Sequence, residues 1–308
     1  MVMVETSNLT KKYSNTTVVD NLNLKIDEGQ IYGFLGPNGA GKTTTILMLL
    51  GLTRPTSGFA SINGLNSTHE ALKVKRISGY IPEKVGFYND LSARYNLLYT
   101  ANLNGVFDEK AEKAVNQALA DVGLKDKSDE LVAHFSKGMK QRLAIADILI
   151  KQPRVAFLDE PTSGIDPAGI TQILDLIAEI ARNKNMTIVM SSHQLSQIQR
   201  ICSHVGILSK GKLISEGSIQ ELSKKAGEGK VAIEVQLAEI TPDIIENIKT
   251  VKGILSVDQN ENTLTLTCSD DLRREISKAI SDKGGLITQM QLQSYALEDI
   301  YLKMIKGA

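Results

Sequence analysis

Residues 31–50 read IYGFLGPNGAGKTTTILMLL, and this stretch decides the fold class of the chain. Its first five residues form an apolar run that is typical of a buried strand. A glycine-rich loop follows, in which Gly36, Gly41, Lys42 and Thr43 keep the spacing of a phosphate-binding loop. The apolar residues after the loop recur at helical spacing. A strand, a glycine-rich loop and a helix in this order predict a nucleotide phosphate site, whereas a chance glycine-rich turn would require all three features to coincide.

The loop supplies the groups that a phosphate chain needs. Glycines let backbone N–H groups turn inward, and the N-terminus of the following helix adds a partial positive charge. We expect Lys42 to reach the β- and γ-phosphates of a nucleotide and Thr43 to bind Mg²⁺ through its hydroxyl. The residues expected to contact the phosphates are Gly36, Pro37, Asn38, Gly39, Ala40, Gly41, Lys42, Thr43 and Thr44.

A second apolar strand ends in two carboxylates. Residues 155–161 read VAFLDEP, so Asp159 and Glu160 follow four apolar residues. Asp159 suits the coordination sphere of Mg²⁺, and Glu160 is placed to orient or deprotonate an attacking water. The alternative is that both carboxylates lie in a solvated loop. An apolar strand directly before them, in a chain that already has a phosphate loop, makes this alternative less favourable.

Residues 135–142, FSKGMKQR, predict a second anion site. Ser136 stands where a helix could begin, and Gly138 follows two positions later. The simpler interpretation of Ser136 is a plain N-cap that stabilises its helix by about 1 kcal/mol. We expect Lys140 and Arg142 to form only a solvated face of this helix.

Composition limits the functional classes. The chain has 308 residues, is 42% hydrophobic, and carries 35 basic and 35 acidic residues. This balance argues against a general nucleic-acid coat or a polybasic membrane anchor. The two cysteines, Cys202 and Cys268, lack a metal-ligand spacing. The simplest interpretation is that both are buried free thiols in a reducing cytoplasm. No apolar run approaches the roughly 20 residues that span a bilayer, so a membrane role is expected only through a partner.

Taken together, the motifs resemble those of the ATP-binding subunit of an ATP-binding cassette (ABC) transporter. The resemblance covers roughly residues 3–220, with every expected motif in order. Ser136, Gly138 and Met139 match the family's signature, usually LSGGQ. Tyr13 resembles the aromatic residue that stacks on adenine, although alone it would more often be an edge-strand aromatic. Glu83, Asp166 and His193 lie in segments that match three further motifs: GYIPEKVGF at 79–87 for the Q loop, SGID at 163–166 for the D loop, and SSHQL at 191–195 for the switch histidine.

The resemblance implies a mechanism, cofactors and partners. ATP and Mg²⁺ are the implied ligands; Thr43, Glu83 and Asp159 would hold the metal, and Glu160 and His193 would be catalytic. Two copies would pack head to tail, so that Ser136 grips the γ-phosphate bound by the other copy. A separate integral membrane permease would hold the chain at the inner, cytoplasmic face of the membrane, and no nucleic-acid partner is implied.

The chain departs from the family pattern in its Q loop and its signature. Glu83 stands where Gln is commoner; it still offers acceptor oxygens, but when ionised it cannot donate a hydrogen bond. Lys137 and Met139 replace the usual Gly and Gln of the signature. These features resemble a bacterial exporter branch that handles drugs and peptide antibiotics of the bacitracin and lantibiotic type.

The predicted architecture is an α/β P-loop NTPase cassette with a helical subdomain, followed by a small α+β domain. The expected boundaries are 1–220 for the cassette, with the helical subdomain at about 84–150, then 221–229 for a linker. Residues 230–308 show the order β-α-β-β-α-β of a ferredoxin-like accessory domain, with a final helix near 296–306. Residues 84–95, including Phe87 and Tyr88, could dock the permease or form local core.

Two other functions are compatible with parts of this pattern. A soluble ATPase of the same fold could act on ribosomes or DNA, but such proteins usually hold two cassettes or a long coiled-coil insert. The stretch between Lys42 and Ser136 is too short for that insert. A non-hydrolysing interaction module is the other alternative, and the intact Lys42, Asp159, Glu160 and His193 argue against it.

Overall fold

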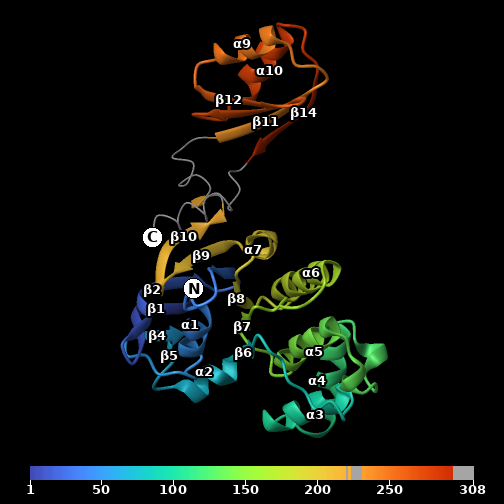
Figure 1. Ribbon diagram of the computed structural model, residues 1–308. Coiled ribbons are helices and arrows are strands. Elements are labelled where there is room, and N and C mark those ends of the chain that lie inside the picture. Colours follow the sequence, from blue (N-terminus) through green and yellow to red (C-terminus); the bar gives the residue numbers. More distant parts are fainter. Residues whose placement is uncertain (220, 223–230, 294–308) are drawn as a thin grey trace. The chain divides into compact units, whose positions relative to one another are not determined.

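The computed structural model describes residues 1–219, 221–222 and 231–293 (Figure 1). The chain divides into two compact units, Met1–Glu216 and Gly217–Ala308. Residues 223–229 of the expected linker and the expected helix near 296–306 lie outside the described residues.

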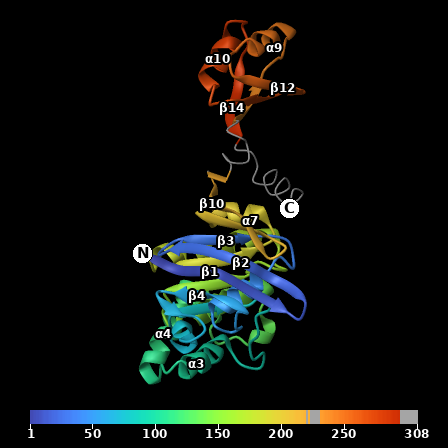
Figure 2. The same ribbon diagram turned by 90° about the vertical axis from the view of Figure 1, so that its left-hand side faces the viewer.

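The first unit contains an antiparallel sheet (Figure 2). Apolar residues alternate along its two long strands. The strand order is β2-β1-β4-β5. Alternation turns one face of β1 and β2 toward the core, where Val4, Leu22 and Ile26 are fully buried. The strand bounds are β1 (Val2–Tyr13), β2 (Thr16–Asp27), β4 (Ser57–Ile62) and β5 (Leu65–Asn66).

The central sheet of this unit is largely parallel. Its order is β10-β9-β3-β8-β7-β6, and β3 runs parallel to both β8 and β9, as β7 does to β6 and β8. Every residue of β7 and β8 is buried, in keeping with a parallel sheet covered on both faces. The strand bounds are β3 (Ile31–Leu35), β6 (Ser78–Ile81), β7 (Val155–Asp159), β8 (Thr187–Ser192), β9 (His204–Ser209) and β10 (Lys212–Ser218).

One core joins the two sheets through α1 (Lys42–Leu49). Ile46, Met48 and Leu49 of this helix pack among apolar residues of both sheets. The other helices that accompany the sheets are α2 (Ala71–Ile77), α6 (Pro167–Asn183) and α7 (Leu195–Ile201). Burial of α1 therefore fixes the start of the helix, and with it the phosphate loop, against the strand ends.

Three helices form the expected helical subdomain and gather on the side of the unit away from the antiparallel sheet (Figure 1). They are α3 (Ala93–Leu103), α4 (Asp108–Asp121) and α5 (Lys137–Leu149), with short 3₁₀ turns at Lys125–Lys127 and Val132–His134. Serine side chains cap two of them: Ser92 accepts a hydrogen bond from the Tyr95 amide, and Ser136 from the Met139 amide.

The second unit is a four-stranded antiparallel sheet of order β12-β13-β11-β14 with two helices against one face. Chain order β-α-β-β-α-β and this strand order together give the ferredoxin-like arrangement that the sequence predicts. Ile233, Val235, Leu264 and Leu266 of the sheet bury against Ile244, Ile248, Ile276 and Ile280 of the helices. The bounds are β11 (Val231–Leu237), α9 (Pro242–Lys249), β12 (Ile254–Asn260), β13 (Thr263–Cys268), α10 (Arg273–Ser281) and β14 (Ile287–Gln293).

Candidate functional site

The glycine-rich loop connects β3 to α1, as the sequence predicts. Gly41 precedes the helix at φ 101°, in the left-handed region that glycine tolerates best. A Cβ atom at this position would lie 2.6 Å from the carbonyl oxygen of Val18. Both constraints require glycine here, and they allow the loop to close tightly over the start of α1.

Lys42 is held inside this loop. Its side chain is 6% exposed, and its Nζ donates hydrogen bonds to the carbonyl oxygens of Gly36 at 2.7 Å and Pro37 at 3.3 Å. The same Nζ lies 3.4 Å from Oε1 of Glu160. The ammonium group is therefore positioned before any ligand arrives, with acceptors that a phosphate oxygen can replace.

Asp159 and Glu160 are organised by a serine on the neighbouring strand. Asp159 ends β7 directly beside Ser191 of β8, and the Ser191 hydroxyl donates to Asp159 Oδ1 at 2.6 Å. The same hydroxyl oxygen accepts a hydrogen bond from the Glu160 amide at 3.0 Å. One buried hydroxyl thus orients the first carboxylate and fixes the backbone that carries the second.

Glu160 connects Lys42 to His193. Its backbone adopts φ 49°, an uncommon conformation for a residue other than glycine and one that is often found at functional sites. One carboxylate oxygen faces Lys42, and the other lies 2.9 Å from Nδ1 of His193. Because the His193 side chain is 45% exposed, the row of three groups runs from the buried loop to solvent.

A cavity of about 220 Å³ opens between the loop and Glu160, and Asp159 does not line it. Glu83, which follows β6, lines the same cavity as Thr43 and Glu160. Mg²⁺ is typically bound through one or two carboxylates and the substrate's phosphates, so this set of oxygen donors suits it. Among the described residues no cluster of three or more His, Cys, Asp or Glu side chains could hold a metal on its own. The lining residues are Val18, Asn38, Gly39, Ala40, Gly41, Lys42, Thr43, Thr44, Glu83 and Glu160.

The remaining predicted site residues do not line this cavity. Tyr13 is 49% exposed, and the Lys11 ammonium lies 4.8 Å from the centre of its ring. Ser136 Oγ accepts a hydrogen bond from the amide of Met139, at 3.2 Å, and the Asp166 carboxylate accepts one from the amide of Gly169 at the start of α6. Gly138 lies in the first turn of α5. Each chain therefore presents the phosphate loop and the signature segment as separate sites.

Comparisons with known proteins agree with this geometry. The ABC transporter family model matches residues 19–163, and the model of the C-terminal domain of DrrA1-3-like ATP-binding proteins matches residues 217–305. The bacitracin transport ATP-binding protein BcrA of Bacillus licheniformis is 38% identical over 306 residues, which cover 99% of this chain and 98% of that protein. The chain belongs to the ATP-binding subunits of ABC transporters.

Two further relatives extend the match to the fold and to both units. A solved structure of an ATP-binding subunit of an ABC transporter superposes with a TM-score of 0.65 at 30% identity, over 73% of this chain and 93% of that one. The daunorubicin/doxorubicin resistance ATP-binding protein DrrA of Streptomyces peucetius is 29% identical over 96% of this chain and 88% of its own length. The prediction of a P-loop cassette with a small C-terminal domain is confirmed, as is the assignment of the chain as an ATPase.

Family membership also settles two other expectations. ABC ATP-binding subunits bind ATP and work with a membrane permease, and the ribosome- or DNA-associated alternative is not favoured. Within the part of the chain that the structure describes, no helix is long and apolar enough to cross a membrane.

The sequence did not reveal the residues whose hydrogen bonds hold the site carboxylates and the end of β8 in place. Ser191 is one, and Gln197 is another: its side-chain oxygen accepts hydrogen bonds from Thr162 at 2.7 Å and Ser192 at 3.0 Å. The available signal was the pair of serines that closes the apolar strand before His193. The expectation for Arg142 was wrong, because its guanidinium donates to the Val122 carbonyl and to Gln172, and so links α5 to the end of α4 and to α6.

Burial and the charge of Asp159 also change the pKa of Tyr80, on the neighbouring strand β6. Tyr80 on β6 pairs with Phe157 of β7, close to the carboxylate. Removal from water, and to a smaller extent the negative charge of Asp159, raise the pKa of Tyr80 to about 12. The phenol therefore stays neutral over a wider pH range than that of an exposed tyrosine.

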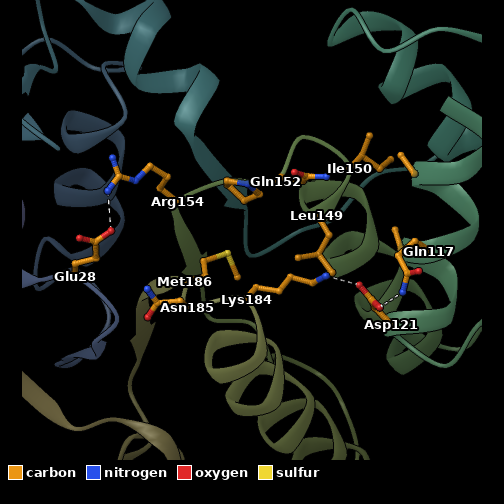
Figure 3. A pocket seen from close by; sticks show the side chains of 13 residues that line it. Glu28, Gln117, Asp121, Leu149, Ile150, Gln152, Arg154, Lys184, Asn185 and Met186 are labelled. Carbon is orange, nitrogen blue, oxygen red and sulfur yellow. Dashed lines mark hydrogen bonds and ion pairs between the residues drawn. The ribbon is translucent and has the colours of Figure 1, made fainter. Parts of the chain in front are cut away.

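A cavity of about 460 Å³ lies at the opposite end of the parallel strands (Figure 3). Arg154 and Met186, which precede β7 and β8, line it together with residues of α4. Its four charged side chains pair with each other, Arg154 with Glu28 and Lys184 with Asp121, each at 2.7 Å. This cavity is remote from the phosphate loop, and its charges are already satisfied.

Proposed function

We propose that the chain hydrolyses ATP with Mg²⁺ in a head-to-tail pair of two copies, and that this cycle drives a separate permease that exports a drug, a peptide antibiotic or a lipid-like cargo. The observation that carries the chemistry is the row Lys42–Glu160–His193 at the mouth of the phosphate loop. A cation, a carboxylate and an imidazole in such a row suit a site where a γ-phosphate and its attacking water would meet.

The residues take distinct roles in the proposed reaction. The loop amides and Lys42 bind the β- and γ-phosphates, and Glu160 accepts the proton of a water that attacks the γ-phosphorus. The bond between that phosphorus and the bridging oxygen breaks, which leaves ADP and inorganic phosphate. Bound Mg²⁺ neutralises charge on the phosphate oxygens, and Asp159, Thr43 and Glu83 would hold it. His193 orients Glu160 and contacts the γ-phosphate, and Tyr13 stacks on the adenine.

The proposed pairing rests on the separation of the two anion sites. Ser136, Gly138 and Met139 lie at the start of a 13-residue helix, but none of them lines the cavity of the phosphate loop. In the proposed dimer, the helix start of one copy faces the nucleotide held by the other, with Asp166 near the contact. Each subunit then supplies half of two composite sites.

The cargo proposal comes from the relatives. BcrA is named for bacitracin transport and DrrA for daunorubicin/doxorubicin resistance, and each aligns with almost the whole of this chain. We place the chain at the cytoplasmic face of the membrane through its permease. Residues 84–95 are the proposed contact; Tyr88 is 53% exposed there and packs edge-to-face against Tyr99.

The decisive experiment compares Glu160→Gln with the native chain. We expect phosphate release to fall by about 10²–10⁴-fold, the usual contribution of a general base, while ATP binding persists because Lys42 and the loop remain. The ATP-bound variant is expected to elute as a dimer in size-exclusion chromatography. Glu109→Gln, an exposed carboxylate on α4, is the matched control.

Two outcomes would contradict the proposal. Equal turnover in Glu160→Gln and the native chain would remove Glu160 from the chemistry. Elution of the ATP-bound variant as a monomer would count against the dimer. The permease is tested separately, by affinity purification of the tagged chain from detergent-solubilised native membranes. Ribosomal proteins in place of a stoichiometric multi-span protein would overturn that part of the proposal.

A further inference from the structure

A buried polar network joins the two loops that carry Glu160 and His193. The first loop follows β7 and contains Glu160 and Thr162, and the second follows β8 and contains His193. The contact between His193 Nδ1 and Glu160 Oε2, at 2.9 Å, spans these two loops. Its length therefore depends on how firmly the two loops are held together.

Gln197, the third residue of α7, is the centre of this network. Its Oε1 accepts hydrogen bonds from the hydroxyls of Thr162, at 2.7 Å, and Ser192, at 3.0 Å. Its Nε2 donates to Oε1 of Gln194 at 2.8 Å, and the Gln194 amide donates to the Ser192 hydroxyl at 3.0 Å. One side chain thus bonds to the loop after β7 and to both residues that flank His193.

Both hydroxyls of the network are closed to water. Ser192 is fully buried and Thr162 is 3% exposed, so each hydroxyl depends on an acceptor within the protein. Gln197, itself only 4% exposed, supplies that acceptor to both. A single side-chain oxygen therefore links the two loops at the ends of their strands.

We propose that Gln197 is a positioning residue for ATP hydrolysis, which keeps His193 within hydrogen-bond distance of Glu160. Gln197 does not line the phosphate-loop cavity, so it acts through these two residues. The Gly36 amide bonds to the carbonyl oxygen of Ser192, and no change of the Gln197 side chain removes this backbone contact. ATP binding should therefore persist while hydrolysis slows. The inference rests on the roles proposed above for Glu160 and His193.

The test begins with Gln197→Met in the full-length chain. Methionine keeps the length of the side chain but removes its acceptor and its donor. We expect kcat for ATP to fall by about 10–100-fold, because a displacement of about 1 Å at a reacting group can cost about 100-fold in rate. The KM and the calorimetric affinity for ATP should stay near their native values. Gln199→Met, at an exposed glutamine on the same helix, is the matched control.

A double variant separates positioning from a purely structural role. Gln197→Met leaves two buried hydroxyls without their acceptor, so it should also lower the melting temperature. Thr162→Val/Gln197→Met replaces both partners of one hydrogen bond by apolar groups of similar shape, which can be nearly neutral for stability. We expect it to regain most of the melting temperature while kcat stays as low as in Gln197→Met. Recovery of native kcat would show that Gln197 only satisfies buried hydroxyls, and would overturn the proposal.

A spectroscopic readout reports on His193 without catalysis. The chain has four histidines, so the imidazole signals of the ¹⁵N-labelled, nucleotide-free chain can be assigned by substitution, that of His193 by its loss in His193→Ala. We expect this signal to move in Gln197→Met and in the double variant, and to keep its native position in Gln199→Met. An unchanged signal together with a reduced kcat would overturn the proposal, because His193 would then be held without Gln197.

Glu160→Gln, measured in parallel, separates this inference from the proposed function. Lost turnover in Glu160→Gln with native kcat in Gln197→Met would overturn only the positioning role. A raised KM with unchanged kcat in Gln197→Met would also overturn it, because Gln197 would then act on nucleotide binding. Native turnover in Glu160→Gln would overturn the proposed chemistry and the positioning role with it.

Discussion

The phosphate loop and the signature segment both lie at the start of a helix, yet their key side chains differ in burial and in hydrogen bonding. Lys42 is 6% exposed and bonded to two loop carbonyls, with Glu160 at 3.4 Å. Ser136 is exposed, and within the described part of the chain its hydroxyl bonds only to an amide of its own helix. The first site is organised by contacts within the chain, whereas the second keeps its groups available to another molecule.

This difference has a consequence for mutagenesis. A substitution in the phosphate loop disturbs a network that already exists in the isolated subunit, so it alters nucleotide binding and chemistry together. A substitution in the signature leaves that network intact. Its effect on turnover should therefore depend on assembly, which gives three ways to test the comparison.

The largest effect is expected for Lys42→Ala. Loss of a preorganised cation that faces the phosphates should reduce ATP turnover by about 10³-fold, as for removal of one strong electrostatic donor. ATP binding should weaken in the same variant, measured by calorimetry on the isolated subunit. Lys110→Ala, an exposed lysine on α4, is expected to behave as the native chain. Turnover within tenfold of native in Lys42→Ala would show that the loop network is not the catalytic site.

Ser191→Ala is expected to have an intermediate effect. The change removes the hydrogen bond to Asp159 and the acceptor for the Glu160 amide, and alanine fits the buried space because it is smaller than serine. Loss of such a supporting contact typically lowers metal affinity or activity by about 10–100-fold. Titration of ATP turnover with Mg²⁺ measures it.

Ser192→Ala is the matched control for this prediction. It removes the neighbouring hydroxyl, which bonds to Gln197 instead of the carboxylates. If both variants shift the Mg²⁺ requirement equally, Ser191 has only a packing role.

The sequence predicted features whose cause is local. The glycine loop requires a particular backbone conformation, and Gly41 adopts it at φ 101°. Alternating and helical patterns likewise predicted the β-α-β-β-α-β order of the second unit. Such signals are readable because the residues that determine them are adjacent in the chain.

The sequence could not predict contacts that depend on strand order and register. Ser191 reaches Asp159 because β8 lies beside β7, and Glu83 lines the phosphate-loop cavity because β6 is the next strand. The solvated face expected for Arg142 was wrong for the same reason, since its partners belong to α4 and α6. The catalytic, metal-binding and ATP-binding roles assigned to individual residues stay predictions, and Tyr13, Ser136 and Asp166 do not line the phosphate-loop cavity.

The smallest effect is expected for Ser136→Ala, and two further variants separate its possible causes. Alanine removes the N-cap, which should cost about 1 kcal/mol and lower the melting temperature by about 2–4 °C. It should also reduce ATP turnover by about tenfold if the hydroxyl contacts a phosphate in the second copy. Ser136→Asp keeps a capping oxygen but brings a negative charge, so we expect a native melting temperature with turnover at least as low as in Ser136→Ala.

Ser136→Thr keeps both the cap and the hydroxyl and is the matched control for these two changes. Thermal unfolding and phosphate release would be measured on the same preparations, above and below the concentration at which ATP-bound Glu160→Gln dimerises. If Ser136 serves only as a cap, Ser136→Asp will match the native chain in both measurements. The signature would then have no anion to bind, and the contrast with the phosphate loop would reduce to a difference in helix capping.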